Sequence, residues 1–495
     1  MKRPPFSRLP HAELAAAAAV AVLTIALGSA VVRAPSMVGT YRDDGIYLAT
    51  SRALAEGQSY RHAELPGEPL ETKYPPLFPA LLALLWRIAP RFPDNVALMQ
   101  IANTALWGLG CWLSYRLMRR AWDLPGWAAL GGTIIALLSP AAAMLLITPM
   151  SEPLYTVLAS AALLVAARAD SPHRTGKAGD AATGAASGGR GETADSARAA
   201  AAGRPALVYA AVAGALAGAA YLTRSVGLAV LVAVPLAILL RRRARPALAA
   251  CASGGMAASA WVIWRTVASA RNAANPLIAA FRYDLDYSAW TPATPAALAW
   301  VALHNAPALV LTLAALTLPL PGPWLDHTLA AGPTAAAPLY AGMAALAACV
   351  LIGAAASWQR RRAEVHLYLL AYCALLLAWP FWALRLLVPI LPLLAALSLY
   401  GLFLIIKRIA GAIPARSVTV LFAFALAGCH GLQVFAPGPA YLAQATAAHR
   451  AREDLAAMIR TQTPPDALIA ANEGAYWHLV TGRKFVPLLA FEDVV

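Results

Sequence analysis

Apolar segments about as long as a bilayer is thick recur along most of this chain. A helix needs about 20 mainly apolar residues to cross a membrane, and many stretches among the 495 residues meet that need. Hydrophobic residues make up 60% of the chain and charged residues only 13%, whereas a soluble protein carries about 25% charged residues. The sequence therefore predicts an all-α polytopic membrane protein.

Eleven of these segments are expected to span the membrane. Basic residues gather in short clusters between them, as they do in cytoplasmic loops, so we place the N-terminus inside and the C-terminus outside. The first segment resembles a signal-peptide core, but it is long for one, and we interpret it as a retained helix. The expected spans are 14–32, 96–115, 127–147, 153–167, 206–222, 226–240, 248–267, 338–356, 365–382, 386–405 and 418–434.

Two further apolar stretches, 77–88 and 296–318, do not fit this alternation. The first is too short to cross a bilayer comfortably, and the second would move the basic cluster Arg360, Arg361 and Arg362 to the outer face. Both are expected to lie on the outer membrane surface or to be re-entrant segments.

The polar stretches predict how the chain is divided. Residues 1–435 are expected to form the transmembrane domain, with a first outer loop at 34–75. A disordered cytoplasmic linker is expected at 170–202, which is poor in large apolar residues. An outer loop with an interfacial helix is expected at 268–335, and a small extracytoplasmic α/β appendage at 436–495.

The charge and the cysteines exclude other classes of protein. The net charge of +15 lies largely in clusters between spans, so nucleic acid is not an expected partner. All five cysteines lie inside apolar segments without the spacing of metal ligands, and we interpret them as small buried hydrophobic residues.

The first outer loop holds the densest charge outside the linker. It includes Asp43 and Asp44, and apolar residues recur at helical spacing from Asp44 to Glu56, which predicts a short amphipathic helix lying on the membrane. Asp43 has two interpretations, a helix N-cap and a general base that takes a proton from a hydroxyl. A low-polarity surface tends to raise the pKa of one carboxyl of such a pair.

Lys73 lies in the same loop, fixed by Pro75 and Pro76. Only five of the 39 lysines and arginines are lysines, so its presence suits a point charge directed at a phosphate. The alternative is an ordinary interfacial lysine whose ammonium extends to the surface.

Other polar residues are expected near the outer ends of spans. Arg224 and Arg385 are candidates for phosphate contacts or for interfacial anchors. Glu152 is a candidate site residue or a carboxylate at a helix N-terminus. Arg282 and Tyr283 belong to a polar and aromatic patch that suits a sugar or an anion. His62 and Glu64 have a spacing that metals use, but two ligands do not make a site, and no nucleotide-binding motif is present.

Five short motifs carry these residues in order along the chain: Asp43-Asp44, Lys73-Tyr74-Pro75-Pro76-Leu77, Ser151-Glu152-Pro153-Leu154-Tyr155, Leu222-Thr223-Arg224 and Arg385-Leu386-Leu387-Val388-Pro389. Together they resemble the GT-C superfamily of polyprenyl-phosphate-sugar-dependent glycosyltransferases. The most similar branch holds bacterial proteins related to protein O-mannosyltransferases and to the aminoarabinose transferase of lipid A. The pair is Asp-Asp where this family commonly has Asp-Glu.

The resemblance implies a membrane glycosyltransferase in the cell inner (plasma) membrane, with its active site facing the periplasm or exterior. Its expected partners are a polyprenyl-phosphate-linked sugar, membrane lipid, and an acceptor that is a lipid, a glycan or a protein. No cofactor is required, and a divalent metal ion at the two aspartates is left open. The implied site residues are Asp43 as base and Asp44 as its support, Lys73, Arg224, Arg385 and Arg282 at the donor phosphate, and Glu152, Tyr74 and Tyr283 at the sugar or acceptor.

Two other classes are weighed against this one. A flippase for lipid-linked sugars or a secondary transporter would favour ionisable residues at mid-membrane on broken helices, whereas here the polar groups crowd one face. A non-catalytic membrane scaffold with an outer binding domain would not need the paired acids.

Overall fold

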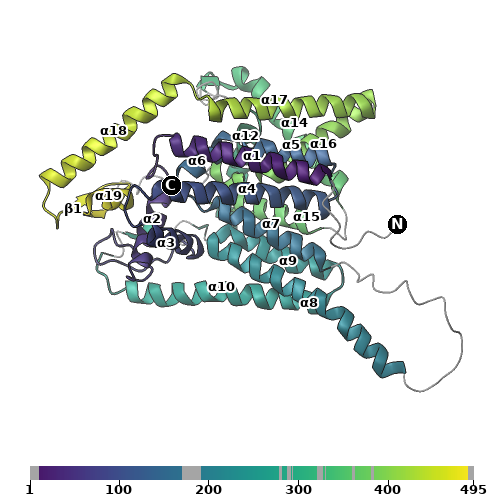
Figure 1. The fold of residues 1–495 in the computed structure, drawn as a ribbon, viewed down its shortest axis with the longest axis horizontal. Helices are drawn as coiled ribbons and strands as arrows, with labels where there is room; N and C mark the ends of the chain where they lie inside the picture. The colour runs from purple at the N-terminus through teal and green to yellow at the C-terminus, as the bar shows by residue number, and fades with distance from the viewer. Residues whose placement is uncertain are drawn as a thin grey trace, which may run out of the picture.

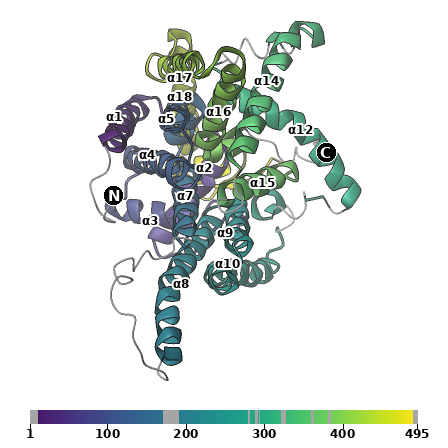
Figure 2. The same ribbon diagram turned by 90° about the vertical axis from the view of Figure 1, so that its right-hand side faces the viewer.

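Long helices run side by side through most of the molecule, and short helices and loops gather at one end of them (Figures 1 and 2). The computed structural model describes residues 11–169, 191–277, 281–286, 291–292, 294–319, 327–328, 330–358, 363–380 and 384–488. The long helices are α1 (His11–Arg33), α4 (Val96–Arg120), α8 (Gly191–Thr223), α10 (Ala244–Asn272), α12 (Pro295–Thr317), α14 (Pro333–Ser357), α16 (Leu391–Ala410) and α17 (Ala412–Phe435).

Within the described residues, eight helices are long and apolar enough to cross a membrane, or nine if a bent pair forms one span. The bent pair is α5 (Gly126–Leu137) and α6 (Pro140–Ile147), which meet at 47° where Pro140 interrupts the helix. Three of the eleven expected spans form helices of only 13 to 17 residues, while the count includes one helix, α12, that was not expected to span. The three short helices are α7 (Glu152–Arg168), α9 (Leu228–Leu240) and α15 (Glu364–Leu377).

Helix α12 covers the apolar stretch that was expected not to span. Its 23 residues have the length and composition of a span, so length does not distinguish it from the other long helices. Its position does: the Asn305 side chain, near its middle, donates hydrogen bonds to the carbonyls of Leu376, Leu377 and Trp379 at the end of α15. The middle of α12 is therefore level with one end of the bundle.

The expected disordered linker is only partly described. Residues 170–190 lie outside the described residues, and from Gly191 the chain is already helical in α8. The helical part is rich in alanine, which has the highest helix propensity, and this composition accounts for the difference from the expectation.

The first outer loop contains the short helix α2 (Asp43–Ala55), which packs against α3 (Leu77–Ile88), the helix that follows the loop. Helix α2 coincides with the short amphipathic helix predicted to lie on the membrane, but none of its residues is exposed. Nearly all of it is buried, because α3 covers one side and α19 (Gly474–Thr481) covers another. Ser51, on α2, accepts a 2.8 Å hydrogen bond from the Trp86 indole of α3.

The chain returns to this loop near its C-terminal end. Helix α18 (Pro439–Gln462) leads to β1 (Leu468–Ala470), α19 and β2 (Lys484–Val486), and the two strands pair in parallel with Ile469 opposite Phe485. The Phe485 amide donates a 2.8 Å hydrogen bond to the carbonyl of Glu64 in the first loop. The C-terminal unit, residues 439–488, therefore covers the first loop directly.

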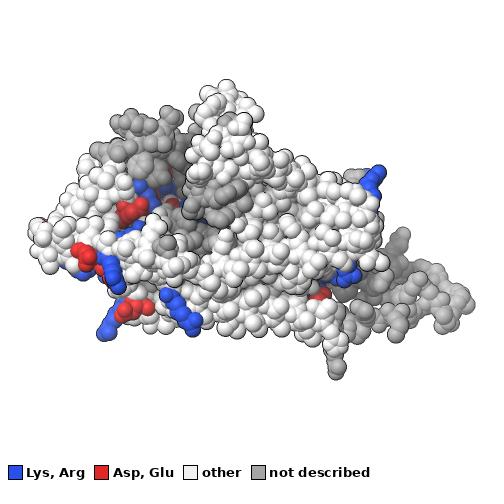
Figure 3. Space-filling view, turned by 90° about the horizontal axis from the view of Figure 1, so that it is seen from above, with Lys and Arg blue, Asp and Glu red and all other residues white. Residues whose placement is uncertain are grey.

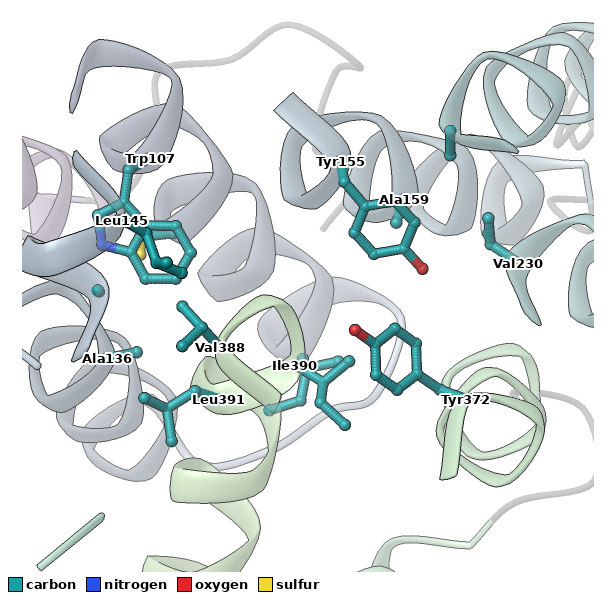
Figure 4. Close-up of a cluster of buried hydrophobic side chains, with 14 of the residues drawn as sticks. Trp107, Ala136, Leu145, Tyr155, Ala159, Val230, Tyr372, Val388, Ile390 and Leu391 are labelled. Atoms are coloured by element: carbon teal, nitrogen blue, oxygen red, sulfur yellow. The ribbon is translucent and has the colours of Figure 1, made fainter. Parts of the chain in front are cut away.

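Buried apolar side chains fix the segment that carries Arg385. This segment is the 3₁₀ helix η5 (Leu384–Ile390), whose residues Val388 and Ile390 enter the core between α4, α7 and α15 (Figure 4). The Tyr372 hydroxyl of α15 donates a 2.6 Å hydrogen bond to the carbonyl of Leu386. Charged side chains on the visible face gather mostly at one end of the molecule (Figure 3).

Candidate active site

A cavity of about 520 Å³ opens at the end of the bundle that carries the first loop. Its charged residues come from four separate parts of the chain, and its walls are apolar and aromatic. The lining includes Asp43, Tyr47, Lys73, Tyr74, Tyr221, Arg224, Leu228, Trp261, Arg265, Leu375, Trp379, Arg385 and Leu386. Five of the residues predicted from the sequence therefore line one cavity: Asp43, Lys73, Tyr74, Arg224 and Arg385.

Asp43 is the first residue of α2, and its carboxylate is held by side chains. One oxygen accepts a 2.6 Å hydrogen bond from the Tyr74 hydroxyl, and the other forms an ion pair with Arg385. The N-cap interpretation is wrong: the cap position belongs to Arg42, and no side chain caps the helix. Burial alone would raise the pKa of Asp43, but the charges of Arg385 and Lys73 and the Tyr74 hydrogen bond outweigh it and lower that pKa.

Asp44 has a different environment, although it is the next residue. Its carboxylate is fully buried and accepts hydrogen bonds from the amides of Gly39 at 2.6 Å and Tyr41 at 3.2 Å. Burial raises its pKa to about 6, against the opposing effect of these amides. Because Asp44 does not line the cavity, its contacts fix the turn before α2.

Lys73 is only 5% exposed, so the interpretation as a lysine that reaches the surface does not describe it. Its ammonium lies 5.1 Å from the centre of the Tyr74 ring. Burial lowers the pKa of Lys73, and the negative charge of Asp43 opposes that shift. The backbone amides of Lys73 and Tyr74 both donate to one oxygen of Glu71, at 2.5 and 2.9 Å.

Glu71 belongs to a buried cluster of which only His62 and Glu64 were singled out from the sequence. His62 lies between two carboxylates, with Nδ1 2.7 Å from Glu64 and Nε2 2.8 Å from Glu71. Burial would lower the pKa of His62, but the charges of Glu71 and Glu64 raise it well above its ordinary value. The protonated ring therefore stabilises the carboxylate that orients Lys73. The feature of the sequence that could have indicated Glu71 is its position two residues before Lys73.

Arg224 lies at the break between α8 and α9. Its guanidinium is 2.6 Å from Glu152 and donates a 2.9 Å hydrogen bond to the Ser151 hydroxyl, which is also 3.2 Å from the Tyr47 hydroxyl. Glu152 is fully buried at the start of α7 and does not line the cavity. The structure therefore brings Glu152 to Arg224, behind the cavity wall.

Arg385 faces the cavity from η5. Besides Asp43, its guanidinium contacts the Met150 sulfur at 3.8 Å and lies 5.5 Å from the centre of the Tyr41 ring. The cavity thus holds four cationic side chains, those of Lys73, Arg224, Arg265 and Arg385, and the carboxylate of Asp43. Such an arrangement is able to bind a phosphate and to accept a proton beside it.

Arg282 and Tyr283 begin the short helix α11 (Arg282–Leu285), but their side chains lie outside the described part of the chain. Their neighbour Asp284 accepts hydrogen bonds of 2.9 and 2.8 Å from Arg42. Among the described residues, no group of three or more His, Cys, Asp or Glu side chains is arranged to hold a metal ion.

Four aromatic cavity residues were not predicted as site residues from the sequence: Tyr47, Tyr221, Trp261 and Trp379. Tyr47 lies one helical turn after Asp43, a spacing that puts both on the same face of α2. Trp261 and Trp379 lie near the ends of apolar segments, where tryptophan ordinarily anchors a helix at the membrane surface. Because this role accounts for a tryptophan at such a position, the sequence did not indicate that these two side chains line a cavity.

No protein-family model matches the chain, and no curated protein matches it in sequence. Its fold is similar to that of ArnT from Cupriavidus metallidurans bound to undecaprenyl phosphate, with a TM-score of 0.55 and 13% identity over 95% of this chain and 85% of ArnT. The apo state of ArnT gives 0.56 and 14% over the same shares.

A second solved structure of similar fold is the archaeal oligosaccharyltransferase AglB from Archaeoglobus fulgidus, in complex with an inhibitory peptide and a dolichol-phosphate. It gives a TM-score of 0.57 and 12% identity over 97% of this chain and 64% of AglB. ArnT and AglB are GT-C enzymes, so the resemblance stated from the sequence is confirmed at the level of the fold. The chain has a GT-C-like membrane fold.

Proposed function

We propose that this protein is a glycosyltransferase that moves a sugar from a polyprenyl-phosphate donor to a hydroxyl or amine of an acceptor. The observation that carries the proposal is the convergence of Asp43, Lys73, Arg224 and Arg385 on one cavity. These side chains, one acidic and three basic, come from four separate motifs in the sequence. The GT-C-like fold supports the same reaction class, since ArnT and AglB with this fold were solved with lipid phosphates.

The cavity suits a ligand with a charged head and an apolar tail. Lys73, Arg224 and Arg385 supply positive charge for the phosphate, while Leu228, Leu375 and neighbouring apolar residues supply a wall for the lipid chain. A sugar attached to the phosphate would extend toward the aromatic side chains and Asp43. Tyr74 would lie beside the sugar or acceptor.

The reaction is a single displacement at the anomeric carbon. The acceptor's O–H or N–H bond breaks and its proton goes to Asp43, while the acceptor atom forms a bond to the sugar's C1. The bond between C1 and the phosphate oxygen breaks, and the lipid phosphate leaves with the electron pair, stabilised by the cations. Attack opposite the leaving group inverts the anomeric centre. We place this reaction at the outer face of the plasma membrane.

The proposal is tested by transfer from a polyprenyl-phosphate sugar in purified, detergent-solubilised protein. Asp43→Asn should lower kcat by about 10²- to 10⁴-fold, the range for loss of a general base. Glu56→Gln is the matched control, because Glu56 lies on the same loop and pairs with Arg52 at 2.7 Å, away from the cavity. Full activity in Asp43→Asn would refute the base.

The same preparation discriminates the transporter class. Reconstituted vesicles that move a lipid-linked sugar across the bilayer, with no glycosyl transfer in detergent or vesicles, would support a flippase and refute the glycosyltransferase. Transfer without such movement is the result expected here.

A further inference from the structure

Asp43, the base proposed for this site, already forms an ion pair with a cationic side chain. Arg385 forms an ion pair with one oxygen of Asp43, and Tyr74 donates to the other. Both interactions favour the ionised carboxylate and so weaken it as a proton acceptor. The proposed base is therefore masked in this structure, meaning that Arg385 and Tyr74 make Asp43 a weaker proton acceptor.

Arg224 and Arg385, the two cavity arginines proposed to contact the phosphate, differ in what holds them. Arg224 is paired with Glu152, which is fully buried behind the wall, and also with Ser151. Arg385 is paired with Asp43, which lines the cavity itself. Among the described residues, its other contacts are the Met150 sulfur and the Tyr41 ring, which are weak partners for a guanidinium.

A phosphate in the cavity would compete for these arginines unequally. Guanidinium groups bind phosphate oxygens in a bidentate manner, so an anion beside Arg385 offers it a partner at least as good as Asp43. Arg224 has less to gain, because moving it would leave the buried Glu152 without its counter-charge. Arg385 is therefore the arginine free to change partner.

We propose that the donor's phosphate takes Arg385 from Asp43 and thereby unmasks the base. This inference rests on the proposed function. After the exchange, Tyr74 still orients the carboxylate, and the arginine stabilises the departing phosphate. Donor binding and base activation become one event, so the acceptor is activated only when a donor is present.

The exchange predicts that removing the charge of Asp43 improves phosphate binding. The probe is undecaprenyl phosphate, and its affinity is read from the fluorescence of the cavity tryptophans at fixed ionic strength. Asp43→Asn should bind the probe about 3- to 10-fold more tightly than the parent protein, because Arg385 no longer has a competing partner. Glu56→Gln, which removes one charge outside the cavity, should leave affinity unchanged.

The double variant Asp43→Asn with Arg385→Gln tests whether the gain in affinity depends on Arg385. This double variant should bind the probe no more tightly than Arg385→Gln alone. A gain that persists without Arg385, or no gain in Asp43→Asn, overturns the exchange. If Lys73→Ala weakens binding while Asp43→Asn does not improve it, only the exchange fails. If the parent protein does not bind the probe, the exchange and the proposed function fail together. Thermal unfolding of each variant shows that it is folded.

Discussion

Tyr74 is the residue that most directly tunes the candidate base. Its hydroxyl donates a 2.6 Å hydrogen bond to Asp43 and so helps to lower the pKa of that carboxyl. Tyr74→Phe should raise the pKa of Asp43, because a hydrogen bond that favours the ionised carboxylate is lost. The acid limb of the pH–rate profile should then move to higher pH, because Asp43 must be ionised to act.

The control for this prediction is Tyr60→Phe. Tyr60 donates a 2.9 Å hydrogen bond to the Tyr74 carbonyl and does not touch Asp43. Tyr60→Phe should leave the acid limb of the pH–rate profile at the same pH as in the parent protein. An unchanged limb in Tyr74→Phe would contradict the role of the hydrogen bond.

Asp44 gives a prediction about stability. Its pKa of about 6 in the folded protein exceeds that of an unfolded aspartate, about 3.9. The folded state therefore keeps this proton where the unfolded chain has lost it, so the Asp44 contribution to the free energy of unfolding falls as the pH rises from about 4 to about 6. The total fall is about 3 kcal/mol.

Asp44→Asn cannot ionise and should lack this pH dependence. The measurement is the apparent Tm of the variant minus that of the parent protein, in detergent, at pH 4.5 and pH 7.5. The difference should become more favourable to the variant at the higher pH. A difference that is the same at both values would contradict the assignment.

The sequence predicts which residues meet at the candidate site better than it predicts their roles. Asp43, Lys73, Arg224 and Arg385 could be singled out because charge at the end of an apolar segment is costly unless it is used. The separation of Asp43 from Asp44 could not be predicted, because it depends on amides at Gly39 and Tyr41. Such contacts follow from a turn geometry that no motif encodes.

The packing of α19 against the first loop depends on a glycine. Gly39 has a φ of +87°, and a Cβ placed there would lie 2.6 Å from the Tyr476 ring of α19. Gly39→Ala should therefore destabilise the protein through both backbone strain and this contact, by about 2 kcal/mol or more. It should also reduce the activity of the neighbouring site.

Gly57→Ala is the matched control. Gly57 has a similar φ of +78° but open space around its Cα, so it should show the backbone effect alone, about 1 kcal/mol. Apparent Tm values of the two variants measure the comparison. Equal losses would show that the contact with Tyr476 contributes nothing.

Helices were predictable where length and apolar content agreed, as in α1, α4 and α17. Element lengths were not predictable where packing ends a helix early. Helix α15 has 14 residues and spans about 21 Å, less than a bilayer core of about 30 Å. Its end at Leu377 is fixed by the Asn305 side chain of α12, which lies 72 residues away in sequence.

The orientation of the whole molecule is tested with two cysteines at opposite ends of the bundle. Asp466 is exposed in the C-terminal unit, and Arg408 is exposed at the far end of α16. In a variant with its own cysteines replaced, Asp466→Cys should react with a membrane-impermeant maleimide on intact cells. Arg408→Cys should react only after the membrane is permeabilised. The reverse pattern would place the candidate site in the cytoplasm.

The cover that the C-terminal unit places over the first loop has a consequence for biosynthesis. Lys484 donates a 2.8 Å hydrogen bond to the carbonyl of Ala63, 421 positions earlier in the chain. A ribosome adding about 5–20 residues per second needs about 20–80 s to cover that distance. During this interval the loop with Asp43 has left the ribosome without its cover. The nascent protein is therefore expected to be inactive until the C-terminal unit has been translated and packs over the first loop.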